Sequence, residues 1–275
     1  AVIFRRTENC ILHDCYIHNV GGNGIFFDKY NRHSAITGSF LTSIGASAIC
    51  FVGDPAGVRS PSFRYEEFVT LDKMDRAKGP LNENHPAYCE VYNNLICNIG
   101  LFEKQITGVE LSMCRNITIS HNSIYDTPRA GINISEGTWG GHIIEYNDIF
   151  NTVKETGDHG TINSWGRDRF WHPNYNIMTQ ITNEKPALIL ADVVEPIIIR
   201  HNRLRCDRGW DIDLDDGSSN YQIYNNLCLN GGIKLREGFY RTVENNIIVN
   251  NTLHPHLWFK NSGDVFSRNI VMTKY

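Results

Sequence analysis

The stretch GWDIDLDDGSSNYQIYNNLCLNGGIKLREG, residues 209–238, contains the two patterns that decide the fold. The first pattern is an apolar residue, any two residues, Asn, any one residue, and then Ile or Leu. It occurs in YQIYNNLC around Asn225. In the second, a short alternating run ends at Gly, as in DIDLDDG and GIKLREG. Repetition of such units every 20 to 29 residues is typical of a solenoid.

The Asn pattern recurs along most of the chain. Adjacent copies lie 25, 23 and 20 residues apart, and we expect each Asn to stack on the next through its side-chain amide, with no chemical role. Two early copies place Cys15 and Ser39 at the Asn position. The other copies are ITISHNSI around Asn122, HIIEYNDI around Asn147, IIIRHNRL around Asn202, and the looser EVYNNLIC around Asn93 and TVENNIIV around Asn245.

Residue types select the kind of solenoid. The chain has neither the dense Leu framework of leucine-rich repeats nor the 3.6-residue periodicity of helical repeats. Its β-branched alternation, punctuated by Asn and Gly, predicts an all-β, right-handed parallel β-helix with several short strands per coil. We expect one domain over residues 1–275, with insertions at about 52–88 and 168–184, belonging to a larger chain.

Composition excludes several classes of partner. A net charge of −4 argues against nucleic acid, and no apolar run is long enough to cross a membrane. The eight cysteines are scattered and never form a CxxC pair, so we expect buried free thiols and no zinc site. Localisation and oligomeric state stay open, with the periplasm or secretion favoured over the cytoplasm.

A polar column follows each Asn in the repeat. The runs AGINISEG, HGTINSWG, DIDLDDG and GIKLREG, aligned on their closing Gly, place Glu136, Trp165, Asp216 and Glu237 before the turn. The runs PALILADV and LWFKNS add Asp192 and Asn261 in looser register. A packing ladder would repeat one apolar residue there, so this mixed column indicates a groove.

Spacing within the column suggests catalysis. Parallel strands lie about 4.8 Å apart, so carboxyl groups on adjacent coils sit roughly 5 Å apart, near the separation used by retaining glycosidases. Glu237 is the candidate acid/base, and the nucleophile lies among Asp213, Asp215 and Asp216. If Ile212 and Leu214 point inward, then Asp211, Asp213 and Asp215 point outward together. Asp216 would face outward only if the turn breaks the strand. Asp213 and Asp215 would neighbour Lys234 and Arg236, either as a working site or as an ion-paired surface ladder.

Two other functions use the same residues. In a calcium-dependent polysaccharide lyase the aspartates would bind the cation while Lys234 or Arg236 removed a proton. A non-catalytic adhesin is the third alternative, although it would not need acids converging with His159 and Trp165. Calcium is expected only in the lyase, and no cofactor otherwise.

The segments GDHGTINSWGRDRFW (Gly157–Trp171), DIDLDDGSSN and GGIKLREGF resemble bacterial β-helical glycoside hydrolases. The chain from about Gly131 onward is similar to the β-xylosidases of glycoside hydrolase family 120 and to the related family 141 fucosidases and xylanases. This resemblance implies retaining hydrolysis of pentose-containing oligosaccharides by exo attack, with an Asp nucleophile and a Glu acid/base. It also implies a sugar site lined by His159, Asn163, Trp165, Arg167 and Asp168.

Overall fold

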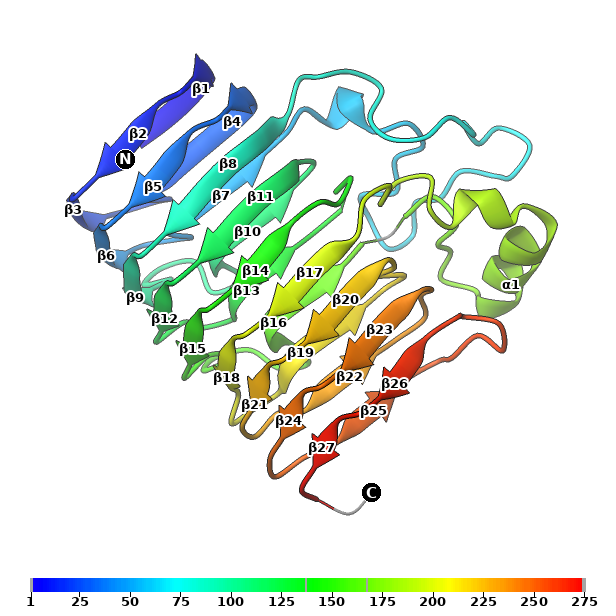
Figure 1. Cartoon of the computed structure of the whole chain (residues 1–275). Coiled ribbons are helices and arrows are strands. Elements are labelled where there is room, and N and C mark those ends of the chain that lie inside the picture. The colour runs from blue at the N-terminus through cyan, green and yellow to red at the C-terminus, as the bar shows by residue number, and fades with distance from the viewer. Residues whose placement is uncertain (1, 137, 167, 274–275) are drawn as a thin grey trace.

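The protein is a stack of coils, each built from three short strands. The computed structural model describes residues 2–136, 138–166 and 168–273. Its strands are all parallel to their neighbours, and every third strand pairs, so that three faces, called here sheets one to three, run along the stack. Sheets one and two are joined into one 18-stranded sheet, because Asn31 and Arg32 also pair with Pro86 and Ala87. Figure 1 shows the coils following one another from the N-terminus to the C-terminus. This arrangement is a parallel β-helix, as the repeats predict.

Each of the three sheets takes one strand from every coil. Sheet one contains β1 (Val2–Glu8), β4 (Ile25–Arg32), β7 (Ile49–Val52), β10 (Thr107–Ser112), β13 (Ala130–Ile134), β16 (Gly160–Trp165), β19 (Trp210–Asp215), β22 (Ile233–Leu235) and β25 (Leu253–Pro255). Sheet two contains β2 (Ile11–His13), β5 (Ala35–Thr37), β8 (Pro86–Tyr92), β11 (Arg115–Ser120), β14 (Ile143–Glu145), β17 (Ile197–Arg200), β20 (Tyr221–Tyr224), β23 (Arg241–Glu244) and β26 (Val265–Ser267). Sheet three contains β3 (Tyr16–Val20), β6 (Phe40–Ile44), β9 (Leu95–Ile99), β12 (Ser123–Tyr125), β15 (Asp148–Phe150), β18 (Arg203–Arg205), β21 (Leu227–Cys228), β24 (Ile247–Ile248) and β27 (Ile270–Val271).

The core fills the space between the three sheets. Inward side chains from successive coils lie in register, as Ile162, Ile212 and Ile233 do in sheet one, and all three are fully buried. Burying one such side chain contributes about 1.5–3 kcal/mol. Six cysteines are buried free thiols, and three of them, Cys89, Cys114 and Cys228, belong to this core, whereas Cys10 and Cys15 of the first coil are half-buried. No disulfide forms among the described cysteines, as the sequence predicts.

An Asn ladder closes the corner between sheets two and three. In each step the side-chain amide donates to the next Asn Oδ1 at 3.0 Å, as from Asn122 to Asn147 and from Asn147 to Asn202. Ser39 and Cys15 continue the ladder toward the N-terminus, because Cys15 N donates to Ser39 Oγ and Ser39 N to an Asn Oδ1. These positions confirm the prediction.

Three of the predicted ladder positions are wrong by one residue. The ladder uses the second Asn of each NN pair, which is Asn94, Asn226 and Asn246. The first Asn of each pair, at 93, 225 and 245, instead has φ between 55° and 57° and turns the chain. Asn tolerates this left-handed conformation better than most residues.

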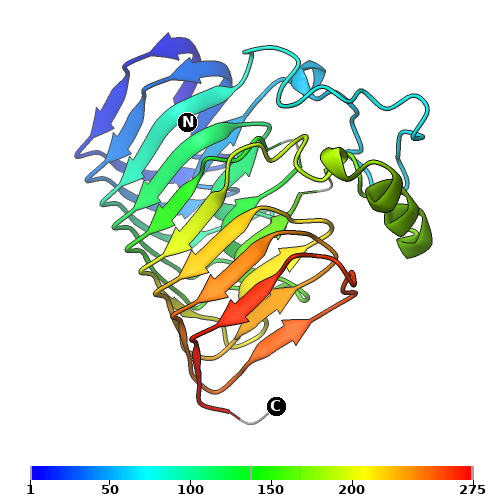
Figure 2. The same ribbon diagram turned by 45° about the vertical axis from the view of Figure 1, so that its right-hand side comes forward.

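Two excursions leave the stack after strands of sheet one. Residues 53–85 follow β7 and contain the 3₁₀ turn η1 (Pro55–Gly57), and residues 166–196 follow β16. The second holds α1 (Tyr175–Glu184), capped by the side chain of Asn174, and η2 (Pro186–Leu188). In Figures 1 and 2 both excursions lie on the same side of the stack. Within the described residues, no helix has the length and apolar character needed to cross a membrane.

The second excursion is longer than predicted. PALILADV (186–193) forms η2 and loop instead of a strand, because Pro186 begins the 3₁₀ turn. LWFKNS (257–262) also lies beyond β25 and outside any strand. The apolar residues of both excursions pack into a second core. It contains Val69, Leu71, Met74, Phe170, Trp171, Met178, Ile181, Leu188, Phe239 and Phe259.

Candidate active site

A polar row crosses the outer face of sheet one. Its residues are partners in the strand register, so their side chains leave the sheet at successive coils. Ile212 and Leu214 are fully buried in the core, which confirms the predicted alternation and turns Asp213 to the other face. The row runs through Glu110, Asn133, Asn163, Asp213, Lys234 and His254.

Asp211 has a structural role on the same face. Its carboxylate accepts hydrogen bonds from the backbone N–H groups of Cys206 at 2.7 Å, Gly231 at 2.8 Å and Gly232 at 3.0 Å. These bonds hold two neighbouring turns together. Burial raises the pKa of Asp211 to about 6 although the backbone bonds oppose the shift.

Lys234 contacts three carboxyl groups. Its Nζ lies 3.1 Å from Asp213, 3.4 Å from Asp158 and 3.6 Å from Asp215. Burial alone would lower the pKa of Lys234, but the three carboxylates outweigh burial and raise it. Burial raises the pKa of Asp213 to about 7 although Lys234 acts in the opposite direction. Lys234 is therefore a charged centre at neutral pH.

Arg236 lies two residues after Lys234, just past the end of β22, and contacts three acids, of which Asp215 is shared with Lys234. Its Nη1 is 2.9 Å from Asp215 and 3.4 Å from Asp216, and its Nε is 2.9 Å from Glu237. Strand β19 ends at Asp215, and Asp216 has φ of 29°. The turn thus breaks the alternation and brings both aspartates to the same guanidinium.

Glu237 is the most buried of the three acids that contact Arg236. Its side chain is 2% exposed, and Trp171 Nε1 donates to Oε1 at 3.4 Å. Burial raises the pKa of Glu237 against the opposing influence of Arg236. Trp171 belongs to the second excursion, so this excursion covers the site next to Glu237.

Trp165 lies on the adjacent coil, in register with Asp215. Alignment of the sequence on the closing glycines pairs Trp165 with Asp216 instead, and the structure corrects this by one residue because the turns differ in geometry. Trp165 Nε1 donates to Glu136 at 2.7 Å, and the guanidinium of Arg129 lies 4.5 Å from the ring. Arg129 is 1% exposed, and its Nε and Nη2 have no hydrogen-bond partner among the described residues.

Asn163 and His159 hold the strand that carries Trp165. Asn163 Nδ2 donates to Asn133 at 3.1 Å, and its Oδ1 accepts from Gly160 N at 3.1 Å. His159 Nδ1 bonds to Thr156 Oγ1 at 3.0 Å, and burial lowers the pKa of His159 to about 4. His159 is therefore neutral at pH 7.

Asp192 and Asp168 lie apart from the Arg236 cluster, under the first excursion. Arg169 holds Asp192 through its backbone N at 2.7 Å and its Nε at 3.0 Å. Asp168 is 3% exposed, and its Oδ2 has no hydrogen-bond partner among the described residues. Arg167 lies outside the described residues.

Sequence reasoning missed several members of the site. Arg129 and Asp158 come from turns whose distance along the chain gives no sign of their proximity. Glu110 lies 133 − 110 = 23 residues before its register partner Asn133, which is one repeat, so extending the polar column toward the N-terminus would have found it. The aromatic run of the second excursion, which contains Trp171, suits stacking on sugar rings, but the sequence does not predict the hydrogen bond from Trp171 to Glu237. Burial raises the pKa of Glu110 to about 7, while Asn133 donates to it at 2.9 Å.

Together these features define a parallel β-helix with a largely buried cluster of acids and two cations on one sheet. No protein-family model matches the chain, and no curated protein matches it in sequence. Two solved structures are similar over 98% of the chain, each at 12% identity and a TM-score of 0.50. One is a glycoside hydrolase, and the other is the A-module of mannuronan C-5 epimerase AlgE6 from Azotobacter vinelandii.

The chain spans only 38% of that glycoside hydrolase and 59% of that epimerase module. At this identity the similarity concerns the fold alone. It agrees with the parallel β-helix that the strand pairings define.

Proposed function

We propose that the protein is a retaining glycoside hydrolase, with Asp215 as nucleophile and Glu237 as acid/base. One observation carries this proposal. Asp215 and Glu237 bind different nitrogens of the same guanidinium, but Asp215 is 18% exposed whereas Glu237 is 2% exposed. Retaining glycosidases use such a pair of neighbouring carboxyl groups, one as nucleophile and the other as acid/base.

Accessibility selects Asp215 among the three candidate nucleophiles. Its side chain is 18% exposed, compared with 0% for Asp213 and 7% for Asp216. A nucleophile must reach the anomeric carbon, so a fully enclosed carboxylate is a poor candidate. Lys234 and Arg236 both contact Asp215 Oδ1, so two cations hold this carboxyl group in place.

Glu237 has the complementary properties of a proton donor. Burial favours its protonated form, and Trp171 orients the carboxyl group through Oε1. In the first step Glu237 would donate its proton to the leaving oxygen as Asp215 bonds to the anomeric carbon. In the second, ionised Glu237 would take a proton from water as that water displaces Asp215.

The substrate class rests on the sequence resemblance to family 120 and 141 enzymes. We propose β-xylosidic or similar linkages in polysaccharide-derived oligosaccharides, cleaved by a right-handed β-helix of bacterial type without an organic cofactor. The fold shared with a glycoside hydrolase and with a mannuronan epimerase is compatible with a carbohydrate substrate. Trp165, Glu136, Asn163 and His159 would line the sugar site, with Arg167 beside them.

The lyase alternative needs an unprotonated base. Acidic neighbours raise the pKa of both Lys234 and Arg236, so neither would be neutral near pH 7. This property favours the hydrolase, in which both residues stay charged and hold Asp215.

Nitrophenyl β-xyloside, xylo-oligosaccharides and polygalacturonate with or without calcium provide the test. We expect calcium-independent release of nitrophenol and xylose. Glu237→Gln should lower kcat for the oligosaccharides by roughly 10²–10⁴-fold with an unchanged circular dichroism spectrum. Glu145→Gln, which alters a carboxylate paired with Arg200 on sheet two, is the matched control.

Chemical rescue distinguishes the two roles. Azide should restore turnover in Asp215→Ala with inversion at the anomeric carbon, and in Glu237→Ala with retention. Unsaturated product that disappears with a chelator would instead establish the lyase and end the hydrolase proposal.

A further inference from the structure

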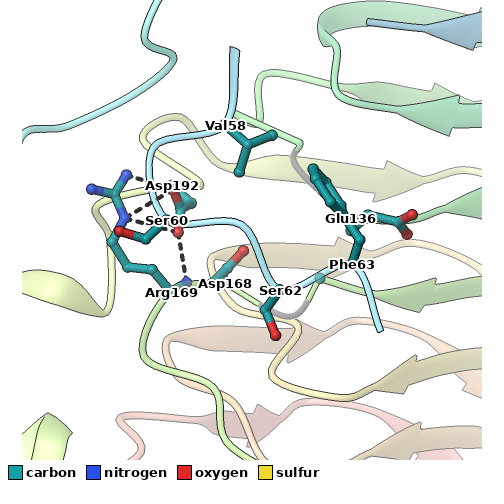
Figure 3. Close-up of a pocket in the computed structure, with 9 residues that line it drawn as sticks. Val58, Ser60, Ser62, Phe63, Glu136, Asp168, Arg169 and Asp192 are labelled. Atoms are coloured by element: carbon teal, nitrogen blue, oxygen red, sulfur yellow. Dashed lines mark hydrogen bonds and ion pairs between the residues drawn. The ribbon is translucent and has the colours of Figure 1, made fainter. Parts of the chain in front are cut away.

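A small cavity lies under the first excursion, apart from the Arg236 cluster but lined by Glu136, which accepts the hydrogen bond of Trp165. Its volume is about 10 Å³, close to the least that holds one water molecule. Figure 3 shows residues 58–63 passing over the cavity, with Asp168 on its floor. The lining combines apolar walls from Val58 and Phe63 with the polar groups of Ser60, Ser62 and Asp168.

Asp168 is an anomaly in this cavity. A buried carboxyl oxygen normally has a hydrogen-bond partner, and leaving it without one costs about 1–3 kcal/mol. Oδ2 of Asp168 has none among the described residues. In Figure 3 its carboxyl group points away from the Arg169–Asp192 pair and into the space below the loop. The neighbouring arginine therefore does not satisfy it.

The surroundings of Asp168 favour its neutral form, which can both donate and accept a hydrogen bond. Burial and the nearby charge of Asp192 raise the pKa of Asp168 well above its ordinary value, despite the opposing charge of Arg169. A neutral carboxylic acid offers one donor and one acceptor, which is the complement of a hydroxyl group.

The loop above supplies matching groups. Ser60 Oγ accepts from Asp75 N at 3.0 Å, so its own proton remains available to donate. Ser62 donates to Glu67 O, which leaves its oxygen available to accept. Both serines are buried, at 6% and 7% exposure.

The cavity is connected to the reacting groups through its wall. Gly166 lines it and directly follows Trp165, the register partner of Asp215. Gly166 N donates to Ser218 Oγ at 3.3 Å, and Ser218 Oγ donates to Asp215 O at 2.6 Å. A group seated here would lie beside the strand end that carries the nucleophile.

We propose that this cavity is a hydroxyl-binding subsite, in which Asp168 and the serines of the first excursion receive one hydroxyl group of the bound sugar. The inference rests on the proposed function and adds to it a specificity-determining contribution from Ser60 and Ser62. An ordered water occupies the subsite when no sugar is bound. The subsite selects a sugar with a free hydroxyl at one ring position and excludes a larger substituent there.

A substrate–variant cycle tests the proposal. The wild type, Asp168→Ala, Asp168→Asn and Ser60→Ala are assayed on nitrophenyl β-xyloside and on its 2-, 3- and 4-deoxy analogues. At one ring position, removing the substrate hydroxyl should lower kcat/KM of the wild type roughly tenfold more than it lowers kcat/KM of Asp168→Ala or Ser60→Ala. The variants have already lost the contact with that hydroxyl. Asp168→Asn should behave like the wild type, since an amide also offers a donor and an acceptor.

Two controls keep the result interpretable. Ser123→Ala on sheet three should show the full wild-type penalty at every position, and thermal melting establishes that each variant folds. Additive losses at all three positions would overturn the subsite and leave an ordered water only.

If no glycoside is hydrolysed, the same cycle is measured as binding of xylose and its deoxy forms by titration calorimetry. Non-additivity in binding without hydrolysis would retain the subsite and refute the hydrolase. Absence of any sugar binding would overturn both.

Discussion

Arg236 Nη1 lies 2.9 Å from Oδ1 of Asp215, a residue of the preceding coil. The same guanidinium contacts Asp216 and Glu237, so it neutralises part of a three-carboxylate cluster. Without it, the acids would repel one another while Lys234 alone remained near Asp215. The arrangement of the reacting acids therefore depends on one side chain that does not itself react.

We expect Arg236→Met to lower kcat/KM for nitrophenyl β-xyloside by roughly 10²–10³-fold, as loss of a preorganised charge does in other enzymes. Arg236→Lys should recover only part, because an ammonium group cannot bind three acids through a planar fork. Arg200→Met removes an arginine paired with Glu145 on sheet two and is the matched control. Equal activity in Arg236→Met and Arg200→Met would refute the role of Arg236.

The pH profile should report the proton on Glu237. Burial raises the pKa of Glu237, so the proton donor persists to higher pH than for an exposed glutamate, and activity falls as pH rises through that value. The Trp171 hydrogen bond lowers the pKa of Glu237. Trp171→Phe should therefore move the falling limb of kcat/KM to higher pH. An unmoved limb in a folded variant would show that another group controls it.

The local sequence pattern was sufficient to predict the fold, but the structure was needed to show which Asn of each NN pair joins the ladder. The spacing of Asn122, Asn147 and Asn202 and the alternation around Ile212 predict stacked parallel strands. The NN pairs are ambiguous in sequence because either Asn could turn the chain or join the ladder. Only packing decides: the second lies three residues after an inward apolar residue, so its amide is buried.

The site residues were predictable where strand alternation fixes the direction of their side chains. They were not predictable where the site depends on contacts with residues of other coils and loops. Asp213 and Asp215 follow from alternation with Ile212 and Leu214. The contact between Trp165 and Asp215 spans an excursion whose length hides the register. Arg129 and Trp171 reach the cluster from a turn and a loop, and the sequence gives no periodic signal for either position.

Adjacent residues of one NN pair provide a test of the ladder. Asn226 is buried: its Nδ2 donates to Ile199 O at 2.9 Å and to Asn246 Oδ1 at 3.0 Å. Its Oδ1 accepts from Asn202 twice. Asn226→Ala should lower the free energy of unfolding by about 2–4 kcal/mol, because several buried groups lose their partners.

The neighbouring substitution is the control. Asn225 is exposed with φ of 57°, a conformation that glycine adopts without strain. Asn225→Gly should therefore change the free energy of unfolding by less than about 1 kcal/mol. Urea denaturation of the two variants measures the difference. A larger loss at Asn225 than at Asn226 would reverse our assignment of the ladder.

His142 should make the fold sensitive to acid. It is fully buried, accepts from Ile117 N at 3.2 Å through Nδ1, and bonds to Thr138 Oγ1 through Nε2. Burial lowers the pKa of His142 to about 3 from an ordinary value of 6.5. A lowered pKa in the folded state means that the unfolded chain binds the proton first. The contribution of His142 to stability is complete above pH 6.5 and is lost as pH falls toward 3.

Comparison with His142→Gln isolates this contribution, because the other titrating groups are common to both proteins. At pH 7.5 the variant should be less stable by about 1–3 kcal/mol, owing to the lost buried hydrogen bonds. Between pH 6.5 and 4.5 the wild type should lose about 2–3 kcal/mol more than the variant, so that the gap closes or reverses. Asn225→Gly, which removes no titrating group, should stay at a constant difference from the wild type over the same range. Urea denaturation at each pH measures the three proteins, and a gap between wild type and His142→Gln that does not change with pH would mean that the imidazole is already protonated in the fold.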